Sequence, residues 1–101
     1  MEWIKVLDDS LSLSEGSVME VFAGARNLAL SKVNGVICAI DGKCPHEGGP
    51  LGKGEIENGH VTCPWHGYAF QPCTGKDAFN PAKGVEVFPV EGREDGVYVG
   101  I

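Results

Sequence analysis

Two short segments of the chain each carry one cysteine and one histidine. Cys44 lies two residues before His46, and Cys63 lies three residues before His66, with sixteen residues between the pairs. Thiolate and imidazole side chains bind transition metals of intermediate softness. Two matched pairs of this kind therefore predict a metal centre built from both segments.

The type of metal centre is open at this point. The ligand inventory matches a Cys2His2 zinc site, but zinc sites commonly keep the two cysteines together and the two histidines together. Here each segment offers one of each, as if two metal ions shared the ligands. Glycines beside the ligands (Gly48, Gly49 and Gly67) allow backbone N–H groups to approach and point inward. That arrangement suits bridging sulfides and is not required around zinc.

The elements that must position these residues are short strands. Expected strands cover 3–9, 17–24, 26–33, 36–41, 54–57, 60–63, 85–92 and 96–101. Asn34-Gly35 and Asn58-Gly59 each join two of them and favour type I′ hairpins, because both turn positions take positive φ. No window has a sustained helical period. The sequence predicts one all-β domain over residues 1–101, with roughly eight to ten short strands.

The ligands fall in the connections between these strands. The run 42–53 carries four glycines and two prolines and reads as a loop. The second pair follows the 54–63 hairpin directly, so its cysteine closes a strand and its histidine lies in a turn. We expect two ligand-bearing loops, at about 42–53 and 63–75, that face each other above the sheet.

The quoted segments "CPH" and "CPWHG" resemble the ligand signature of Rieske 2Fe–2S proteins, and the flanking segments follow the same family pattern of strands and turns. The resemblance implies that Cys44 and Cys63 bind one iron, while His46 and His66 bind the other. It also implies a Rieske-like fold, with stacked antiparallel sheets and a two-loop cluster-binding tip.

The resemblance also bears on the reduction potential. Two histidine ligands leave the oxidised cluster neutral, whereas four thiolates leave it anionic, and Rieske potentials span about −150 to +300 mV. In the family that this chain resembles, high-potential members have an extra cysteine in each loop, and the two form a disulfide. Gly49 and Trp65 occupy those positions here. The high-potential members also place serine and tyrosine hydroxyls where this chain has Tyr68 and Phe70. Fewer donors to the cluster predict a potential at the low end of the range.

Other cysteines and histidines are not expected to be ligands. His60 shares a strand face with Thr62, and the alternation places it toward solvent. Cys38 reads as a small core residue and Cys73 as an exposed residue in a turn. In a cytoplasmic protein such cysteines are expected to be thiols or ligands rather than disulfides.

Apolar residues around the second ligand pair allow two interpretations. Trp65 and Tyr68 could pack so that they shield the cluster, which is the reading we prefer. Alternatively, Trp65, Pro45 and Pro50 could form an apolar docking rim for a partner, as the resemblance implies. Glu47 is either a neighbour that tunes an imidazole or a solvated charge.

Composition excludes several classes of partner. The net charge is −6 and no basic run exists, so nucleic-acid binding is not expected. No stretch approaches the roughly 18 apolar residues of a membrane span. The N-terminal segment carries acidic residues where a secretory signal would be basic. We expect a complete, cytoplasmic protein.

These observations predict an electron carrier rather than an enzyme. Similar small proteins pass electrons from a flavoprotein reductase to a terminal oxygenase, often of an aromatic-ring dioxygenase system, by transient docking at the cluster tip. The oxygenases of the family also need a mononuclear iron held by two histidines and a carboxylate. Only His60 remains here after the cluster ligands are assigned. The alternatives are a small Rieske-like subunit of a nitrite reductase and, less favoured, a zinc-stabilised interaction module.

Overall fold

Strands supply nearly all of the regular structure in the computed structural model, which describes residues 1–45, 48–65, 67–80 and 82–101. These ranges contain ten strands in three antiparallel sheets, two 3-10 turns (η1, Ser10–Ser12; η2, Leu51–Lys53) and no α-helix. Across the same residues, no helix is long and apolar enough to cross a membrane. The expected all-β class is confirmed.

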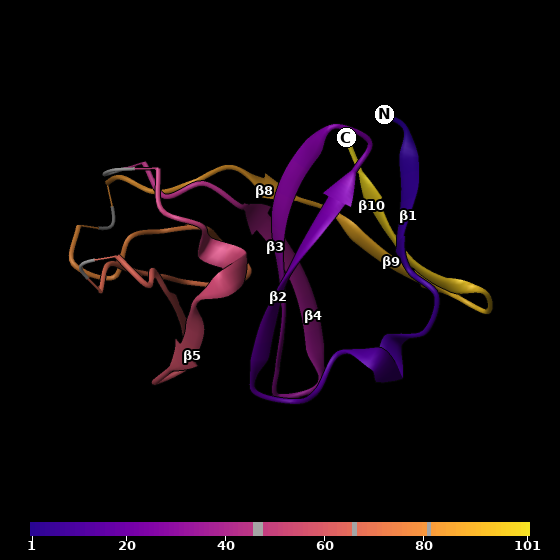
Figure 1. The fold of residues 1–101 in the computed structure, drawn as a ribbon, viewed down its shortest axis with the longest axis horizontal. Coiled ribbons are helices and arrows are strands. Elements are labelled where there is room, and N and C mark those ends of the chain that lie inside the picture. The colour runs from indigo at the N-terminus through magenta and orange to yellow at the C-terminus, as the bar shows by residue number, and fades with distance from the viewer. Residues whose placement is uncertain (46–47, 66, 81) are drawn as a thin grey trace.

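The central sheet lies in the middle of the molecule (Figure 1). Its strand order is β2-β3-β4-β8, with β2 at Ser17–Ala23, β3 at Arg26–Val33, β4 at Val36–Asp41 and β8 at Val87–Phe88. The first three of these strands match the expected ranges to within one residue. Consecutive strands are joined by tight turns, so the sheet forms largely from neighbouring segments of the chain.

Both Asn-Gly turns adopt the backbone that the sequence predicts. Asn34 and Gly35 have φ of 53° and 77°, and Asn58 and Gly59 have φ of 52° and 75°. The first turn is also held from outside, because the carboxylate of Glu15 accepts hydrogen bonds from the N–H groups of Asn34 and Gly35, each at 2.7 Å. The hairpins therefore fix the register of β3 with β4 and of β5 with β6.

A terminal sheet brings the two ends of the chain together. It has the order β1-β10-β9, with β1 at Trp3–Leu7, β9 at Val90–Arg93 and β10 at Gly96–Gly100. The expectation of one strand over 85–92 is wrong, because Pro89 divides it. Proline has no N–H to donate to a ladder, and at Pro89 the chain leaves the central sheet and enters the terminal sheet.

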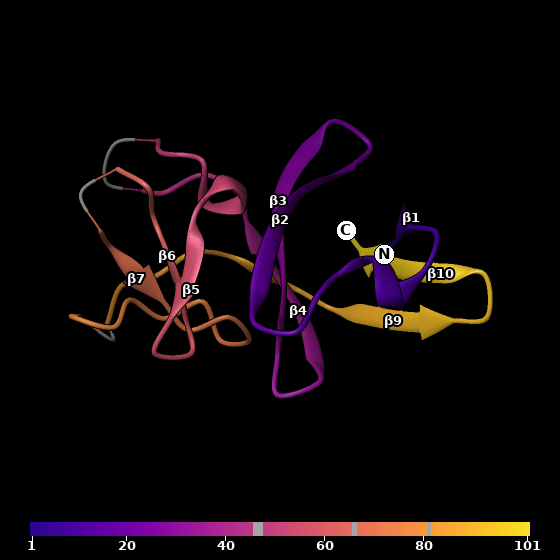
Figure 2. The same cartoon turned by 60° about the horizontal axis from the view of Figure 1, so that its bottom comes forward.

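The third sheet adjoins the two expected ligand loops and has the order β5-β6-β7, with β5 at Glu55–Glu57, β6 at His60–Thr62 and β7 at Ala69–Phe70. The two-residue strand β7 was not expected from the sequence. Figure 2 shows this sheet and the terminal sheet at opposite ends of the molecule, with the central sheet between them. The longest dimension is 37 Å, so the ligand loops lie far from the chain termini.

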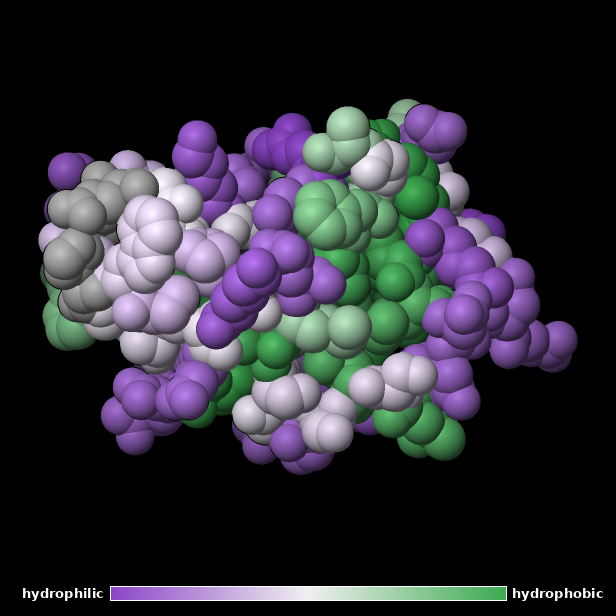
Figure 3. Space-filling view, viewed as in Figure 1, coloured by the Kyte–Doolittle hydropathy of each residue, from purple (hydrophilic) through white to green (hydrophobic). Residues whose placement is uncertain are grey.

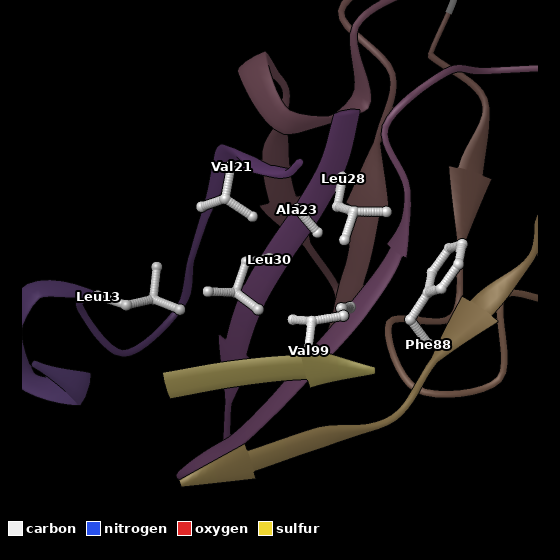
Figure 4. Close-up of a cluster of buried hydrophobic side chains, with 8 residues drawn as sticks. Leu13, Val21, Ala23, Leu28, Leu30, Phe88 and Val99 are labelled. Carbon is white, nitrogen blue, oxygen red and sulfur yellow. The ribbon is translucent and has the colours of Figure 1, made fainter. Parts of the chain in front are cut away.

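Two hydrophobic cores lie on the two faces of the central sheet. Alternation along β3 sends Leu28 and Leu30 into the core shared with the terminal sheet, and Ala29 into the core shared with the third sheet. Figure 4 shows the first core, in which Leu28 and Leu30 lie near Val99 of β10. On the face shown in Figure 3, apolar residues gather over the central and terminal sheets, and polar residues are frequent around both ends.

Candidate metal centre

The two cysteine-bearing loops are closed by the same backbone hydrogen bond. The N–H of Cys44 donates to the carbonyl of Gly49 at 2.8 Å, and the N–H of Cys63 donates to the carbonyl of Tyr68 at 2.7 Å. In each case the acceptor lies five residues after the cysteine. The same backbone hydrogen bond therefore joins the two ends of each loop.

Glycines with left-handed backbone complete both loops. Gly48 and Gly67 each lie four residues after the cysteine, and both have φ of 73°. Other residues rarely adopt this conformation, so glycine suits it at both positions. The N–H of Gly48 donates to the carbonyl of Cys44 at 2.8 Å. This donor holds the loop itself, which differs from the expectation that it points toward a bridging sulfide.

Both cysteines are buried beneath the loops. Cys44 is 1% exposed and Cys63 is 2% exposed. They belong to one hydrophobic core with Ala29, Ile40, Leu51, Val61 and Phe70, which lies between the central and third sheets. The structure therefore brings together the two thiols that the sequence singled out, in a place shielded from water.

Gly49 and Trp65 face each other across the two loops. A Cβ built on Gly49 would lie 2.6 Å from the Sγ of Cys63, and 3.3 Å from both Cγ and Cδ2 of Trp65. Trp65 is nevertheless 48% exposed. One side of its indole covers Gly49 and the other side meets solvent. Packing and exposure therefore both apply to Trp65, where the sequence left them as alternatives.

Charged side chains hold the base of the first loop. The N–H of Lys43 donates to Oδ1 of Asp41 at 3.2 Å. Arg26 donates from Nη2 to Oε1 of Glu86 at 2.6 Å and lies 4.0 Å from Oδ2 of Asp41. Its guanidinium also stacks over Phe88, 4.8 Å from the ring centroid. These contacts join the end of β4 to the segment that enters β8.

Half of the expected ligand set lies within the described residues. Cys44 and Cys63 are brought together, whereas His46, Glu47 and His66 lie outside the described residues. His60 is half-buried, and its Nδ1 lies 3.0 Å from the carbonyl oxygen of Asn58. The buried side of its strand is formed by Val61 and by Cys63 just after it. The alternation expected for 60–63 is therefore confirmed.

The expectation for the remaining two cysteines is wrong. Cys38 and Cys73 form a disulfide, with Cα atoms 5.1 Å apart, although 35 residues separate them in the sequence. Cys73 is exposed, as expected, but Cys38 is half-buried rather than a core residue. The expectation rested on the reducing character of the cytoplasm. The pairing depends instead on the turn that carries Cys73 lying beside β4, which no local pattern reveals.

Comparison with known proteins identifies a family and several relatives. Residues 2–89 match the Rieske [2Fe-2S] domain. The chain is 35% identical over 99 residues to Ferredoxin CarAc of Metapseudomonas resinovorans, covering 96% of this chain and 92% of the relative. It is 40% identical over 88 residues to apoptosis-inducing factor 3 of Homo sapiens, covering 86% of this chain but only 14% of that longer protein.

A solved structure gives the same result in three dimensions. A chain in the complex of reduced oxygenase and oxidized ferredoxin in carbazole 1,9a-dioxygenase superposes with a TM-score of 0.85 at 34% identity. The match covers 97% of this chain and 92% of that one. With two matched cysteine loops at one end of an all-β fold, the chain belongs to the Rieske [2Fe-2S] family.

Proposed function

We propose that this protein is a Rieske-type ferredoxin, a one-electron carrier that passes electrons from a flavoprotein reductase to a terminal oxygenase. The observation that carries this proposal is the pair of matched loops at one end of the molecule. They bury Cys44 and Cys63 and leave Trp65 half-exposed beside them. A carrier needs its redox group near a surface that a partner can approach, and this end of the molecule provides one.

The residues present fit a Rieske cluster. Two buried thiols on converging loops are suitable donors for one iron, and Gly49 leaves room against the Sγ of Cys63. We assign Cys44 and Cys63 to one iron, and His46 and His66 to the other. When bound, the cluster takes up and releases one electron. Family membership sets the zinc-stabilised module aside.

The potential is proposed to lie at the low end of the Rieske range, which spans about −150 to +300 mV. Gly49 and Trp65 face each other where a disulfide would brace the loops in high-potential members. Phe70 is fully buried in the core below the loops and has no hydroxyl to donate to the cluster. Fewer donors leave the added electron less stabilised.

The partners are proposed to dock transiently at the loop end. Trp65 and Pro45 are exposed there and supply apolar contact area. The net charge of −6 favours partners whose docking surface is basic. Ferredoxin components of dioxygenase systems are among the relatives, including a naphthalene 1,2-dioxygenase/salicylate 5-hydroxylase component of Ralstonia sp at 35% identity. We place the carrier in the cytoplasm, where such reductases and oxygenases work.

The test begins with the purified protein. Two irons and two acid-labile sulfides per chain, with a Rieske-type EPR signal on reduction, are the expected result. His46→Ala and His66→Ala should each abolish that signal, and His60→Ala should leave it intact. A colourless protein that contains zinc would overturn the proposal. Stable co-purification with a large partner would instead favour a subunit, such as that of a nitrite reductase.

A further inference from the structure

We propose that the Cys38–Cys73 disulfide is a reversible two-electron thiol–disulfide site that a dithiol reductant can reach from solvent. We further propose that its oxidised form fastens together the two segments that carry the ligand loops. This site is separate from the metal centre, whose cysteines are buried beneath the loops.

The disulfide lies at the surface. Cys73 is exposed and Cys38 is half-buried. Both sulfur-bearing residues line an open groove of about 410 Å³, together with Ile37, Val87, Phe88, Pro89 and Val90. Thiol–disulfide exchange requires that an attacking thiolate reach one sulfur along the S–S axis. Cys73 is the more exposed residue, so we expect an incoming thiolate to reach its Sγ first.

The exchange balances with a dithiol as reductant. One thiolate of the dithiol attacks Sγ of Cys73, which forms a mixed disulfide and releases Cys38 as a thiolate that takes up a proton. The second thiolate of the dithiol then attacks the other sulfur of the same dithiol, which is bonded to Cys73 in the mixed disulfide. This step releases Cys73 as a thiolate, which is protonated in turn. Two electrons and two protons reach the protein, and the dithiol leaves as a cyclic disulfide.

Contacts other than the disulfide hold both cysteines in place. Oε1 of Gln71 accepts hydrogen bonds from the N–H groups of Cys73 at 2.6 Å and Thr74 at 2.8 Å. The N–H of Gly75 donates to the carbonyl of Gln71 at 2.8 Å, which closes the same turn. Cys38 is fixed within β4, opposite Ser31 of β3. After reduction the two thiols therefore stay near each other, so that the disulfide can form again.

The position of the disulfide links it to the ligand loops. Cys38 lies on β4, six residues before Cys44, and Cys73 lies ten residues after Cys63. Cys38 thus sits on the strand that leads into the first loop, and Cys73 sits in the turn that follows β7, after the second ligand pair. Opening the disulfide removes the covalent tie between those segments. This step rests on the proposed function, because it concerns retention of the cluster.

The first experiment counts accessible thiols in the folded holoprotein. Before reduction, a maleimide should label neither Cys38 nor Cys73. After reduction with dithiothreitol and removal of the reductant, it should label both. Reduced protein that is reoxidised with glutathione disulfide before the maleimide is added should again remain unlabelled. The buried Cys44 and Cys63 should stay unlabelled throughout. Labelling before reduction, or resistance to dithiothreitol until the protein is denatured, would overturn the proposed site, whatever the fate of the electron-carrier proposal.

The second experiment follows cluster loss by visible absorbance during challenge with an iron chelator. The oxidised wild type, in which the disulfide is intact, should lose its cluster several-fold more slowly than the reduced wild type, in which dithiothreitol has opened the disulfide. The double variant Cys38→Ser/Cys73→Ser should behave like the reduced wild type, and dithiothreitol should not alter its rate. Equal rates in the oxidised and reduced wild type would overturn the proposed link to the ligand loops.

Discussion

Gly49 lies so close to Cys63 that a Cβ on the glycine would be 2.6 Å from the cysteine Sγ. Real Cβ atoms do not approach other heavy atoms this closely. The contact joins the two loops at the place where their proposed ligands must converge, and the indole of Trp65 covers it from outside. Gly49 therefore serves close approach between side chain and backbone, and not a left-handed turn.

Gly49→Ala should displace Cys63 and lower the cluster content of the protein. Overpacking of this kind costs about 1–3 kcal/mol of folding stability. Iron and sulfide analysis, together with visible absorbance, measures the cluster, and denaturant unfolding measures the stability. Gly92→Ala is the matched control, because a Cβ there meets no atom within 4 Å. Full cluster content in Gly49→Ala would show that the loops adjust without cost.

Trp65→Ala should weaken binding to a partner that docks at the loops. Truncation of a half-exposed tryptophan at the centre of an interface costs about 2 kcal/mol, or roughly thirty-fold in Kd. Binding to the reductase or oxygenase can be measured by titration calorimetry. Trp3→Ala is the control, since Trp3 is also partly exposed but lies on β1 at the opposite end of the molecule (Figure 2). Equal Kd values for the two variants would argue against docking at this end.

Glu15→Ala should destabilise the protein by about 1 kcal/mol, because its carboxylate accepts two hydrogen bonds from the Asn34-Gly35 turn. Glu15→Gln should have an intermediate effect, since only one of its two side-chain positions can still accept. Urea unfolding gives the free energies. Glu94→Ala, at an exposed position, serves as the surface control. The cluster spectrum should be the same in all three variants.

Asp95→Asn should lower the pKa of the Tyr98 phenol. The hydroxyl of Tyr98 donates to Oδ2 of Asp95 at 2.7 Å, and this hydrogen bond raises the phenol pKa above its ordinary value. NMR of labelled tyrosine through an alkaline titration measures it. Glu57→Gln is the control, because Glu57 lies on β5, at the opposite end of the molecule from Tyr98 on β10 (Figure 2). A phenol pKa that is unchanged in Asp95→Asn would assign the shift to another cause.

The same pair sets the sign of a stability effect. Folding raises the pKa of Tyr98, so the hydrogen bond stabilises fully below the unfolded pKa of about 10 and is lost as pH rises through the folded pKa. The hydrogen bond also lowers the pKa of Asp95, so this contribution is present above the unfolded pKa of about 3.9 and is lost as pH falls through the folded pKa. The stability difference between wild type and Tyr98→Phe should therefore be largest between these limits.

Features with a local cause could be predicted from the sequence. The Asn34-Gly35 and Asn58-Gly59 turns follow from the backbone that both residues favour. Burial of Val61 and Cys63 follows from alternation along one short strand. The proposed ligands Cys44 and Cys63 stand out by their spacing, because the two loops are local segments with the same order of residue types.

Features that depend on distant segments could not be predicted. The Cys38–Cys73 disulfide requires the turn that carries Cys73 to return beside β4, which no pattern near either cysteine indicates. Strand β7 has only two residues and forms because β6 is already there to pair with it. Pro89 is an exception: its missing N–H was visible in the sequence and argues against one strand over 85–92.

The matching closures of the two loops have a consequence for assembly. The backbone hydrogen bonds from Cys44 to Gly49 and from Cys63 to Tyr68 each close a loop of only a few residues. Loops this short close on a timescale of about 10–100 ns and carry little entropy cost. The polypeptide can therefore close both loops before any iron binds. Insertion of the inorganic core would then be a late step on a folded chain, in contrast to a zinc finger, whose folding waits for its metal.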